Sequence, residues 1–344
     1  MRVLQEPFKK LNIYDEVGGW LAKDEGFVNV TGSSGSGTDR VFLMEAFADD
    51  APAKMIITYS DRRAEDIYSD LRFYSRDVYM YPAKDILFFS ADVHGNAITR
   101  RRMEVLRKLA TGEKCTIVAT VDALFDKIPA LSYMNRYVIN IHTMDHLNLD
   151  ELKGKLVDLG YEKTDSVEEP GQFAVRGGII DIFPLTEDCP YRIDMWDDEV
   201  DTIKTFDAES QRSIENVDQL VIYPAGEMVL SKDRINRGIR RIKDELGPYS
   251  KKLKAALKTE AYARIKREVA ELEEQLTEFS ATYGVDSYVD YFYSDTVSII
   301  DCLPEKSFVF IDETSKVSDR AVSSEQSFVS AMSHRLEGGY VLPG

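Results

Sequence analysis

A glycine-rich segment near the start of the chain has the spacing of a phosphate-binding loop. Gly32, Gly35 and Gly37 follow an apolar stretch at residues 27–31 and precede a helical pattern that begins at Arg40. A strand, a glycine loop and a helix in this order direct backbone amides at a phosphate group. Nucleotide hydrolysis needs two further side chains after the last glycine: a lysine that neutralises the outer phosphates and a hydroxyl that holds Mg²⁺.

The positions after the loop do not supply those side chains. Thr38 stands where the motif has lysine. Asp39 stands where it has Ser or Thr, and adds a negative charge beside the phosphates. An apolar stretch at 307–311 ends in Asp312 and Glu313, the form in which helicase-type ATPases present a magnesium-coordinating acid and a catalytic acid. We therefore expect a vestigial nucleotide site, without catalytic residues, that does not hydrolyse ATP.

A second candidate site lies in residues 173–207, whose pattern alternates as in β-strands. Within 191–196 the apolar side chains would face a core, whereas Arg192 and Trp196 would face outward, with Arg176 on a neighbouring strand. Arg and Trp are enriched among interface hot spots, and four strand residues separate them by only about 13 Å. The pattern alone leaves two explanations open: a protein-docking surface, or an ordinary surface arginine with a tryptophan packed under another element.

Neither a disulfide framework nor a metal site is expected. The three cysteines, Cys115, Cys189 and Cys302, are far apart and odd in number, which favours a reducing cytoplasm. His142 and His146 have the four-residue spacing of metal ligands on a helix, but their segment has the pattern of a loop.

Composition indicates a globular protein with two or three domains. The chain has 344 residues, 44% of them hydrophobic and 30% charged, and its net charge is −17. This charge disfavours nonspecific nucleic-acid binding by the region as a whole. Two local basic patches, at 100–102 and at Lys251, Lys252 and Lys254, are most simply solvated helix faces. No apolar run approaches the roughly 20 residues that span a bilayer.

The order of the predicted elements divides the chain into three parts. Strand patterns at 54–59, 78–81 and 115–119 alternate with helical ones at 60–74 and 99–111, which is typical of a parallel α/β sheet. From residue 142 a helix at 150–159 is followed by successive strands, which indicates an antiparallel, sheet-rich insert ending near Pro224. A helical segment at 231–279 follows. We expect it to break at Gly247-Pro248 and then to present one apolar stripe from Leu253 through Leu257 to Phe279.

Several runs resemble those of one known family. They are VTGSSGSGTDR at 30–40, the R-G-x-I-x-D-I-F-P block at 176–184, YRIDMWDDEVDTI at 191–203, the FD-x-x-S-Q-R-S run at 206–213, YPAGE at 223–227 and FVFIDET at 308–314. On these motifs nearly the whole chain resembles the N-terminal region of the bacterial transcription-repair coupling factors (Mfd). That region is itself similar to the first part of the nucleotide-excision-repair helicase UvrB.

The resemblance implies an α/β fold with an inserted domain. A degenerate helicase-like, P-loop NTPase-type parallel-sheet domain would be formed by two segments, 1–140 and 225–344. A sheet-rich α+β domain at 141–224 would be inserted between them and would bind UvrA. Two departures separate the chain from UvrB: the phosphate loop lacks its lysine, and residues 81–99 are too short for the tyrosine-rich hairpin that probes damaged DNA.

The same resemblance assigns site residues. Arg176 and Arg192 match UvrA-contacting arginines of the family, and Trp196 stands at a contacting aromatic position that is usually Phe. Ala174 replaces a further arginine of UvrB-like chains. Replacing either arginine by Ala should then weaken UvrA binding and leave the fold intact.

The implied function is a non-catalytic recruitment module in DNA repair that brings UvrA to stalled transcription complexes. The alternative is a UvrB-like region that binds damaged DNA and hydrolyses ATP. Under the first hypothesis the chain needs no cofactor. ATP and Mg²⁺, DNA translocation and the contact with RNA polymerase would belong to modules outside these residues.

Overall fold

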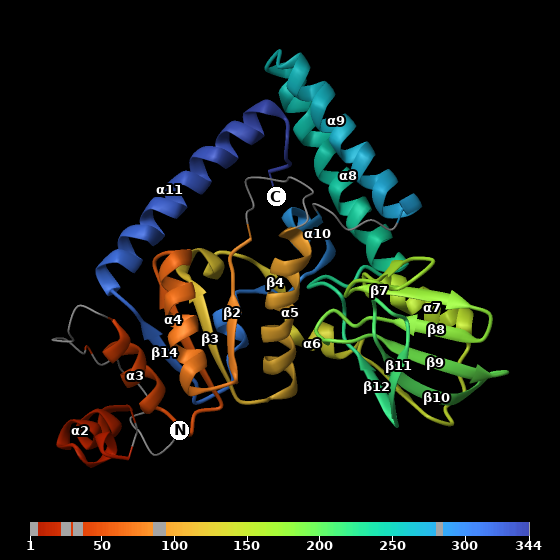
Figure 1. Ribbon diagram of the computed structural model, residues 1–344. Helices are drawn as coiled ribbons and strands as arrows, with labels where there is room; N and C mark the ends of the chain where they lie inside the picture. Colours follow the sequence, from red (N-terminus) through yellow and green to blue (C-terminus); the bar gives the residue numbers. More distant parts are fainter. Residues whose placement is uncertain (1–5, 22–28, 30–36, 85–93, 280–284, 344) are drawn as a thin grey trace. The chain divides into compact units, whose positions relative to one another are not determined.

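The computed structural model describes residues 6–21, 29, 37–84, 94–279 and 285–343 (Figure 1). Gly32 and Gly35, and the predicted strand at 27–31 except Asn29, lie outside the described residues. The chain forms two compact units. Unit 1 comprises Met1–Lys84, Glu104–Asp126 and Ile299–Ser324, and unit 2 comprises Asp85–Met103, Lys127–Ser298 and Glu325–Gly344.

Unit 1 contains a four-stranded parallel sheet in the order β14-β1-β3-β2. Its strands are β1 (Ala53–Thr58), β2 (Val78–Tyr81), β3 (Cys115–Thr120) and β14 (Phe308–Ile311). Every residue of β1 and β3 is buried, as expected for the inner strands of a parallel sheet. Because β14 pairs with β1, two distant segments build this sheet, and the predicted parallel α/β arrangement is confirmed.

The helices of unit 1 include α2 (Asn12–Leu21), α3 (Thr38–Ala46) and α4 (Asp61–Tyr74). Helices α5 (His94–Thr111) and α11 (Thr314–Gly338) have residues in both units. The Ser60 hydroxyl caps α4 by accepting a hydrogen bond from the Arg63 backbone N–H at 3.3 Å, which satisfies one of the amides that a helix start leaves free. Ala64, Ile67 and Leu71 of α4 then pack against the sheet.

Unit 2 contains a six-stranded sheet in the order β11-β10-β9-β8-β7-β6. Its strands are β6 (Glu162–Lys163), β7 (Gln172–Arg176), β8 (Ile179–Ile182), β9 (Tyr191–Trp196), β10 (Glu199–Phe206) and β11 (Ser213–Val217). All neighbours are antiparallel except β6 and β7. Helix α7 (Leu149–Asp158) shares a buried cluster with one face of this sheet.

Two short ribbons complete the strands of unit 2. Strand β5 (Ile139–His142) pairs antiparallel with β12 (Gln219–Ile222). Strands β4 (Ile128–Pro129) and β13 (Thr296–Val297) pair in the same sense. The division of the chain at 140 and 224 stays a prediction.

The helical part of unit 2 is a hairpin of α8 (Lys232–Ala255) and α9 (Thr259–Glu274), continued by a π-helical turn at Gln275–Phe279 and followed by α10 (Val289–Phe292). The predicted break at Gly247-Pro248 is wrong, because Pro248 lies inside α8. Ile242, Leu246 and Leu253 lie on both sides of it and pack into one core. That packing stabilises a continuous helix in spite of the missing proline N–H.

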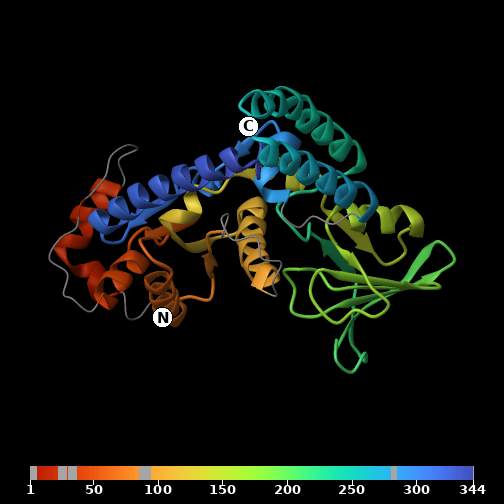
Figure 2. The same ribbon diagram turned by 90° about the horizontal axis from the view of Figure 1, so that it is seen from above.

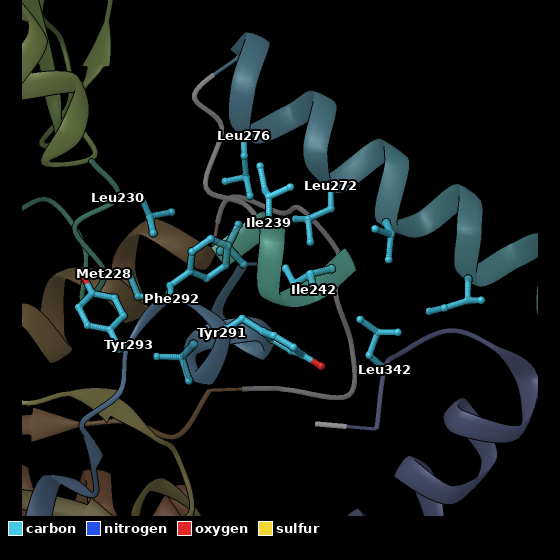
Figure 3. Close-up of a cluster of buried hydrophobic side chains, with 14 of the residues drawn as sticks. Met228, Leu230, Ile239, Ile242, Leu272, Leu276, Tyr291, Phe292, Tyr293 and Leu342 are labelled. Carbon is cyan, nitrogen blue, oxygen red and sulfur yellow. The ribbon is translucent and has the colours of Figure 1, made fainter. Parts of the chain in front are cut away.

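The helix instead ends at Ala255, and Leu257 shortly after it adopts a left-handed conformation with φ of 58°. The N–H of Lys258 donates to the carbonyl of Leu253 at 3.0 Å, and that of Leu257 donates to Lys254 at 3.1 Å, the hydrogen bonds of a Schellman cap. Leu257 is therefore 88% exposed, and its predicted place in the apolar stripe is wrong. The rest of the stripe through Leu276 is buried in the core that Figure 3 shows, and the Phe279 side chain lies outside the described part.

Candidate protein-docking site

The predicted docking residues share one face of the six-stranded sheet. Asp181 of β8 lies opposite Ala174 of β7 and Arg192 of β9. Cross-strand partners point to the same side of a sheet, as do residues two apart on a strand. Arg176 and Trp196 therefore lie on the face that carries Arg192, as the alternation predicted.

Both arginines pair with one buried carboxylate. Asp181 is 1% exposed. Arg192 contacts it at both oxygens, through Nε–Oδ1 at 2.6 Å and Nη2–Oδ2 at 2.9 Å, and Arg176 adds Nη2–Oδ2 at 2.5 Å. Bidentate pairing of this kind fixes the plane of a guanidinium group. The orientation of Arg192 is therefore set before any partner arrives, whereas Arg176 is held by one contact.

The two arginines differ in what they can offer a partner. The side chain of Arg192 is 18% exposed. Its Cζ lies 4.5 Å from the centre of the Phe206 ring, and its Nη1 donates to the Gln211 carbonyl at 3.3 Å. The hydrogen bonds that Arg192 donates to Asp181 raise the pKa of Arg192, although burial opposes this. Arg176, with its side chain half exposed, has more surface free for a partner.

Trp196 projects from the same face. It is the last residue of β9, it pairs with Glu199 across a tight turn to β10, and it is 80% exposed. Asp197 in that turn has φ of 59°, a conformation that Asp tolerates better than most residues. The alternative that Trp196 packs under a neighbouring element is wrong. An exposed indole beside fixed guanidinium groups can fill an apolar pocket on a partner while the arginines meet its carboxylates.

Asp194 lies between Arg192 and Trp196 on this face. Its carboxylate accepts from Lys204 Nζ at 2.7 Å and from the Thr202 hydroxyl at 2.9 Å. Burial opposes ionisation, but these hydrogen bonds prevail and hold the pKa of Asp194 below its ordinary value. Asp194 is thus an internally paired anion within the candidate surface.

Sequence reasoning missed Asp181, Phe206 and Gln211. Asp181 stands in the aliphatic run Ile179–Ile182, where an acid is a signal for a buried partner. That partner can be identified only from the register of three strands.

The residues predicted to form a vestigial nucleotide site lie in unit 1, where those that the structure describes have a defined geometry. Asp312 follows β14, and its N–H donates to the Ile57 carbonyl of β1 at 2.9 Å. The carboxylate is fully buried and receives Arg63 Nε at 2.8 Å, Arg40 Nη1 at 3.1 Å and the Thr58 hydroxyl at 3.3 Å. Arg40 also reaches the Glu313 carboxylate at 2.9 Å. Two guanidinium groups therefore surround the acid that would coordinate magnesium.

The residues after the glycine loop take part in the same cluster or lie near it. Gly37 precedes α3 with φ of 78°, and a Cβ at this position would lie 2.8 Å from Arg63 Nη1. Asp39 accepts from the Arg40 N–H at 2.9 Å, whereas Thr38 is exposed and its hydroxyl donates to Asp70 at 3.4 Å. Hydrogen bonding to Asp312 raises the pKa of Arg63. The structure thus brings Gly37, Asp39, Asp312 and Glu313 around Arg40 and Arg63.

The arginine run at 100–102 is not a solvated face throughout. Arg100 Nη2 pairs with Asp188 at 2.8 Å, and Arg102 Nε pairs with Glu227 at 2.5 Å with neither side chain more than 3% exposed. The predicted solvated face is therefore wrong for Arg102, because its charge is compensated inside the protein.

Other chemistry-bearing residues form local contacts. His142 lies 3.5 Å from Asp145, and His146 lies 3.3 Å from Asp198. Among the described residues there is no group of three or more His, Cys, Asp or Glu placed to hold a metal. Burial raises the pKa of Cys115 to about 11. None of the helices in the described ranges is long and apolar enough to cross a membrane.

Comparison with known proteins gives a consistent result. A family model, the UvrB interaction domain, matches residues 139–228, a range that contains Arg176, Arg192 and Trp196. The transcription-repair-coupling factor of Bacillus subtilis (strain 168) is 30% identical over 311 residues, which are 89% of this chain and 26% of that protein. The factor of Staphylococcus aureus (strain bovine RF122 / ET3-1) is 26% identical over 316 residues, 90% of this chain and 26% of that protein.

The chain thus spans about a quarter of the length of the curated relatives that it matches. The chain is homologous to the N-terminal quarter of the transcription-repair-coupling factors (Mfd), and it contains a UvrB interaction domain.

Proposed function

We propose that this chain is a non-catalytic recruitment module that binds UvrA and so brings nucleotide excision repair to stalled transcription complexes. The observation that carries the proposal is the exposed Trp196 on the same sheet face as Arg176 and Arg192, inside the range matched by the UvrB interaction domain. The partner would supply carboxylates for the guanidinium groups and an apolar pocket for the indole.

Arg176 is the arginine whose removal tests this docking most directly. Its side chain is half exposed and it makes one of the contacts to Asp181, while Arg192 retains two others. Arg176→Ala should therefore weaken UvrA binding by about 2 kcal/mol or more, roughly thirtyfold, with a small change in stability. Isothermal titration of purified UvrA with the 344-residue chain measures this. No binding by the unmodified chain would refute the function itself, and an unchanged titration for Arg176→Ala would remove the arginine from the interface.

We further propose that the parallel sheet of unit 1 is a degenerate helicase-type nucleotide fold. Asp312, the residue in the position of the magnesium-coordinating acid, is buried between Arg40 and Arg63. A divalent cation would have to displace both guanidinium groups, and Thr38 cannot neutralise a triphosphate as the usual lysine does. These contacts support a structural role for the acid and disfavour the alternative, a UvrB-like ATPase that binds damaged DNA.

The chain should accordingly release no phosphate from ATP with Mg²⁺ above the background of buffer. The physical reason is that the loop lacks the lysine that binds the outer phosphates, and that the acid in the magnesium-binding position is paired with two arginines. A phosphate-release assay compares the unmodified chain with Asp312→Asn, which keeps the size of the side chain, beside a working ATPase as positive control. Magnesium-dependent turnover that Asp312→Asn abolishes would contradict the proposal.

In the longer protein, ATP-driven translocation on DNA and the contact with RNA polymerase would be carried out by other modules. Under this proposal the present chain contributes recognition of the repair machinery.

A further inference from the structure

Helix α8 and the turn after it are strongly basic within an acidic chain. Residues 232–258 contain ten lysines and arginines and three acids, whereas the whole chain has a net charge of −17. One of the ten, Arg234, is buried against the ring of Tyr293. The others lie at or near the surface, so the local charge is exposed to any approaching partner.

The free cations of α8 lie opposite its buried face. Figure 3 shows Ile239 and Ile242 pointing into the core, toward Leu272 and Leu276. At 100° per residue, Arg237, Arg240 and Lys251 fall on the opposite side of the helix, with Lys252 and Lys254 flanking them. All five are exposed. We call Arg237, Arg240, Lys251, Lys252 and Lys254 the basic stripe.

These five side chains are not neutralised by the protein. Their neighbours on the helix are engaged: Arg241 donates to the Tyr291 carbonyl at 2.9 Å, and Lys243 pairs with Glu273 at 2.6 Å. Within the described parts of the chain, by contrast, no ion pair or side-chain hydrogen bond engages a member of the basic stripe. Two exposed acids, Asp233 and Asp244, lie on the same side of the helix.

We propose that the basic stripe is a contact surface for the phosphate backbone of duplex DNA. Charge complementarity calls for a polyanion, because exposed cations without partners repel one another until an anion binds. Protein interfaces favour aromatic anchors and are depleted in lysine, and the stripe has three lysines and no aromatic side chain. Its chemistry therefore fits phosphates better than an acidic protein.

The spacing of the stripe fits a groove. Arg240 and Lys251 are eleven residues apart, about 16 Å along the helix. A B-DNA major groove is about 12 Å wide, so a helix lying across it places one basic group near each bordering backbone. Because the five cations are spread along the exposed side of the helix and, among the described residues, no ion pair fixes any of them in a bidentate geometry, we assign the contact to phosphates rather than to base edges. It is therefore independent of sequence and of DNA damage.

The test compares two triple variants with the same change in net charge. The stripe variant is Arg237→Glu, Arg240→Glu and Lys251→Glu. The control variant is Arg62→Glu, Arg76→Glu and Lys163→Glu, at exposed cations outside α8. Fluorescence anisotropy of a labelled 30-base-pair duplex is measured between 50 and 200 mM salt, and thermal melts establish that each variant is folded. A stripe variant with glutamine at the three positions replaces the glutamate one if that fails to fold.

The stripe variant should bind the duplex at least tenfold more weakly than the control variant at 100 mM salt. The slope of log affinity against log salt should also be shallower for the stripe variant, by about 2.7. This figure assumes that three phosphate contacts are lost and that each contributes roughly 0.9 to the slope. Undetectable binding by the unmodified chain at 50 mM salt, or equal losses in both variants, overturns the proposal. Tighter, stripe-dependent binding of polyglutamate than of the duplex would overturn it in favour of an acidic protein. Neither result decides whether the chain binds UvrA, which is measured in a separate titration.

Discussion

Trp196→Ala is expected to weaken UvrA binding by about 2 kcal/mol or more, roughly thirtyfold, and to leave the free energy of unfolding within about 0.5 kcal/mol. The binding loss is large because an indole that enters an apolar pocket removes a large apolar area from water. The stability is unaffected because the side chain is 80% exposed in the free chain, so its truncation creates no cavity.

Isothermal titration of UvrA, together with urea unfolding of each variant, measures both quantities. Phe73→Ala is the matched control, since Phe73 of α4 is also a strongly exposed aromatic residue and has no place in the proposed interface. Equal affinities of Trp196→Ala and Phe73→Ala for UvrA would show that exposure alone does not make Trp196 a contact residue.

Trp196 gives a cleaner test than Arg192. From the sequence, Arg192→Ala was expected to leave the fold intact, and to this the structure adds an expected cost in stability. Arg192 supplies two of the three ion-pair contacts to Asp181, which is almost fully buried. Its removal would leave a buried carboxylate undercompensated, at a cost of about 1–3 kcal/mol. A weaker titration for Arg192→Ala would then report stability as well as binding.

The sequence predicts those residues of the candidate site whose position follows from the alternation of side chains along a single strand. In residues 191–196 each side chain alternates between core and outer face, so Arg192 and Trp196 could be placed on one side from the two-residue period alone. Asp181 could not be found in this way. It belongs to an aliphatic run, and its two partners lie on different strands, so its role depends on the register of β7, β8 and β9.

The same distinction holds for the fold. The strands of the parallel sheet and the helices between them have recognisable hydrophobic patterns in the sequence, and the bounds of most were predicted within a few residues. The pairing of β14 with β1 joins residues about 250 positions apart in the chain. No local pattern predicts it, and only the family resemblance implied that two distant segments form one domain. Pro248 misled because its local preference for ending a helix is outweighed by tertiary packing around Ile242 and Leu253.

The prediction that Arg102 is solvated was wrong for a third reason. Charged residues in a run are usually solvated, and the sequence pattern near Arg102 does not show that its partner is buried with it. Its partner Glu227 lies 125 residues later in the chain, and no local pattern connects the two. Their contact also leads to the largest expected change in stability.

Glu227→Gln should lower the free energy of unfolding by about 3–5 kcal/mol. The substitution keeps the shape of the side chain but removes its charge, so the Arg102 guanidinium stays buried without the carboxylate that it meets at 2.5 Å. Removing that negative charge is costly because the interior solvates the remaining cation poorly. The shift in the midpoint of urea unfolding, at an unchanged slope, measures the effect.

Glu273→Gln is the matched control, since it makes the same chemical change in an ion pair of similar length. Glu273 pairs with Lys243 at 2.6 Å, but both side chains are exposed, and such pairs contribute less than about 1 kcal/mol. Equal shifts for the two Glu→Gln variants would contradict a special role of burial. Replacing both buried partners, with Arg102→Met and Glu227→Leu, should recover much of the loss, because a pair of apolar side chains leaves no charge without a partner. A double variant as unstable as Glu227→Gln would mean that the loss of stability comes from packing around residue 227 rather than from the missing negative charge next to Arg102.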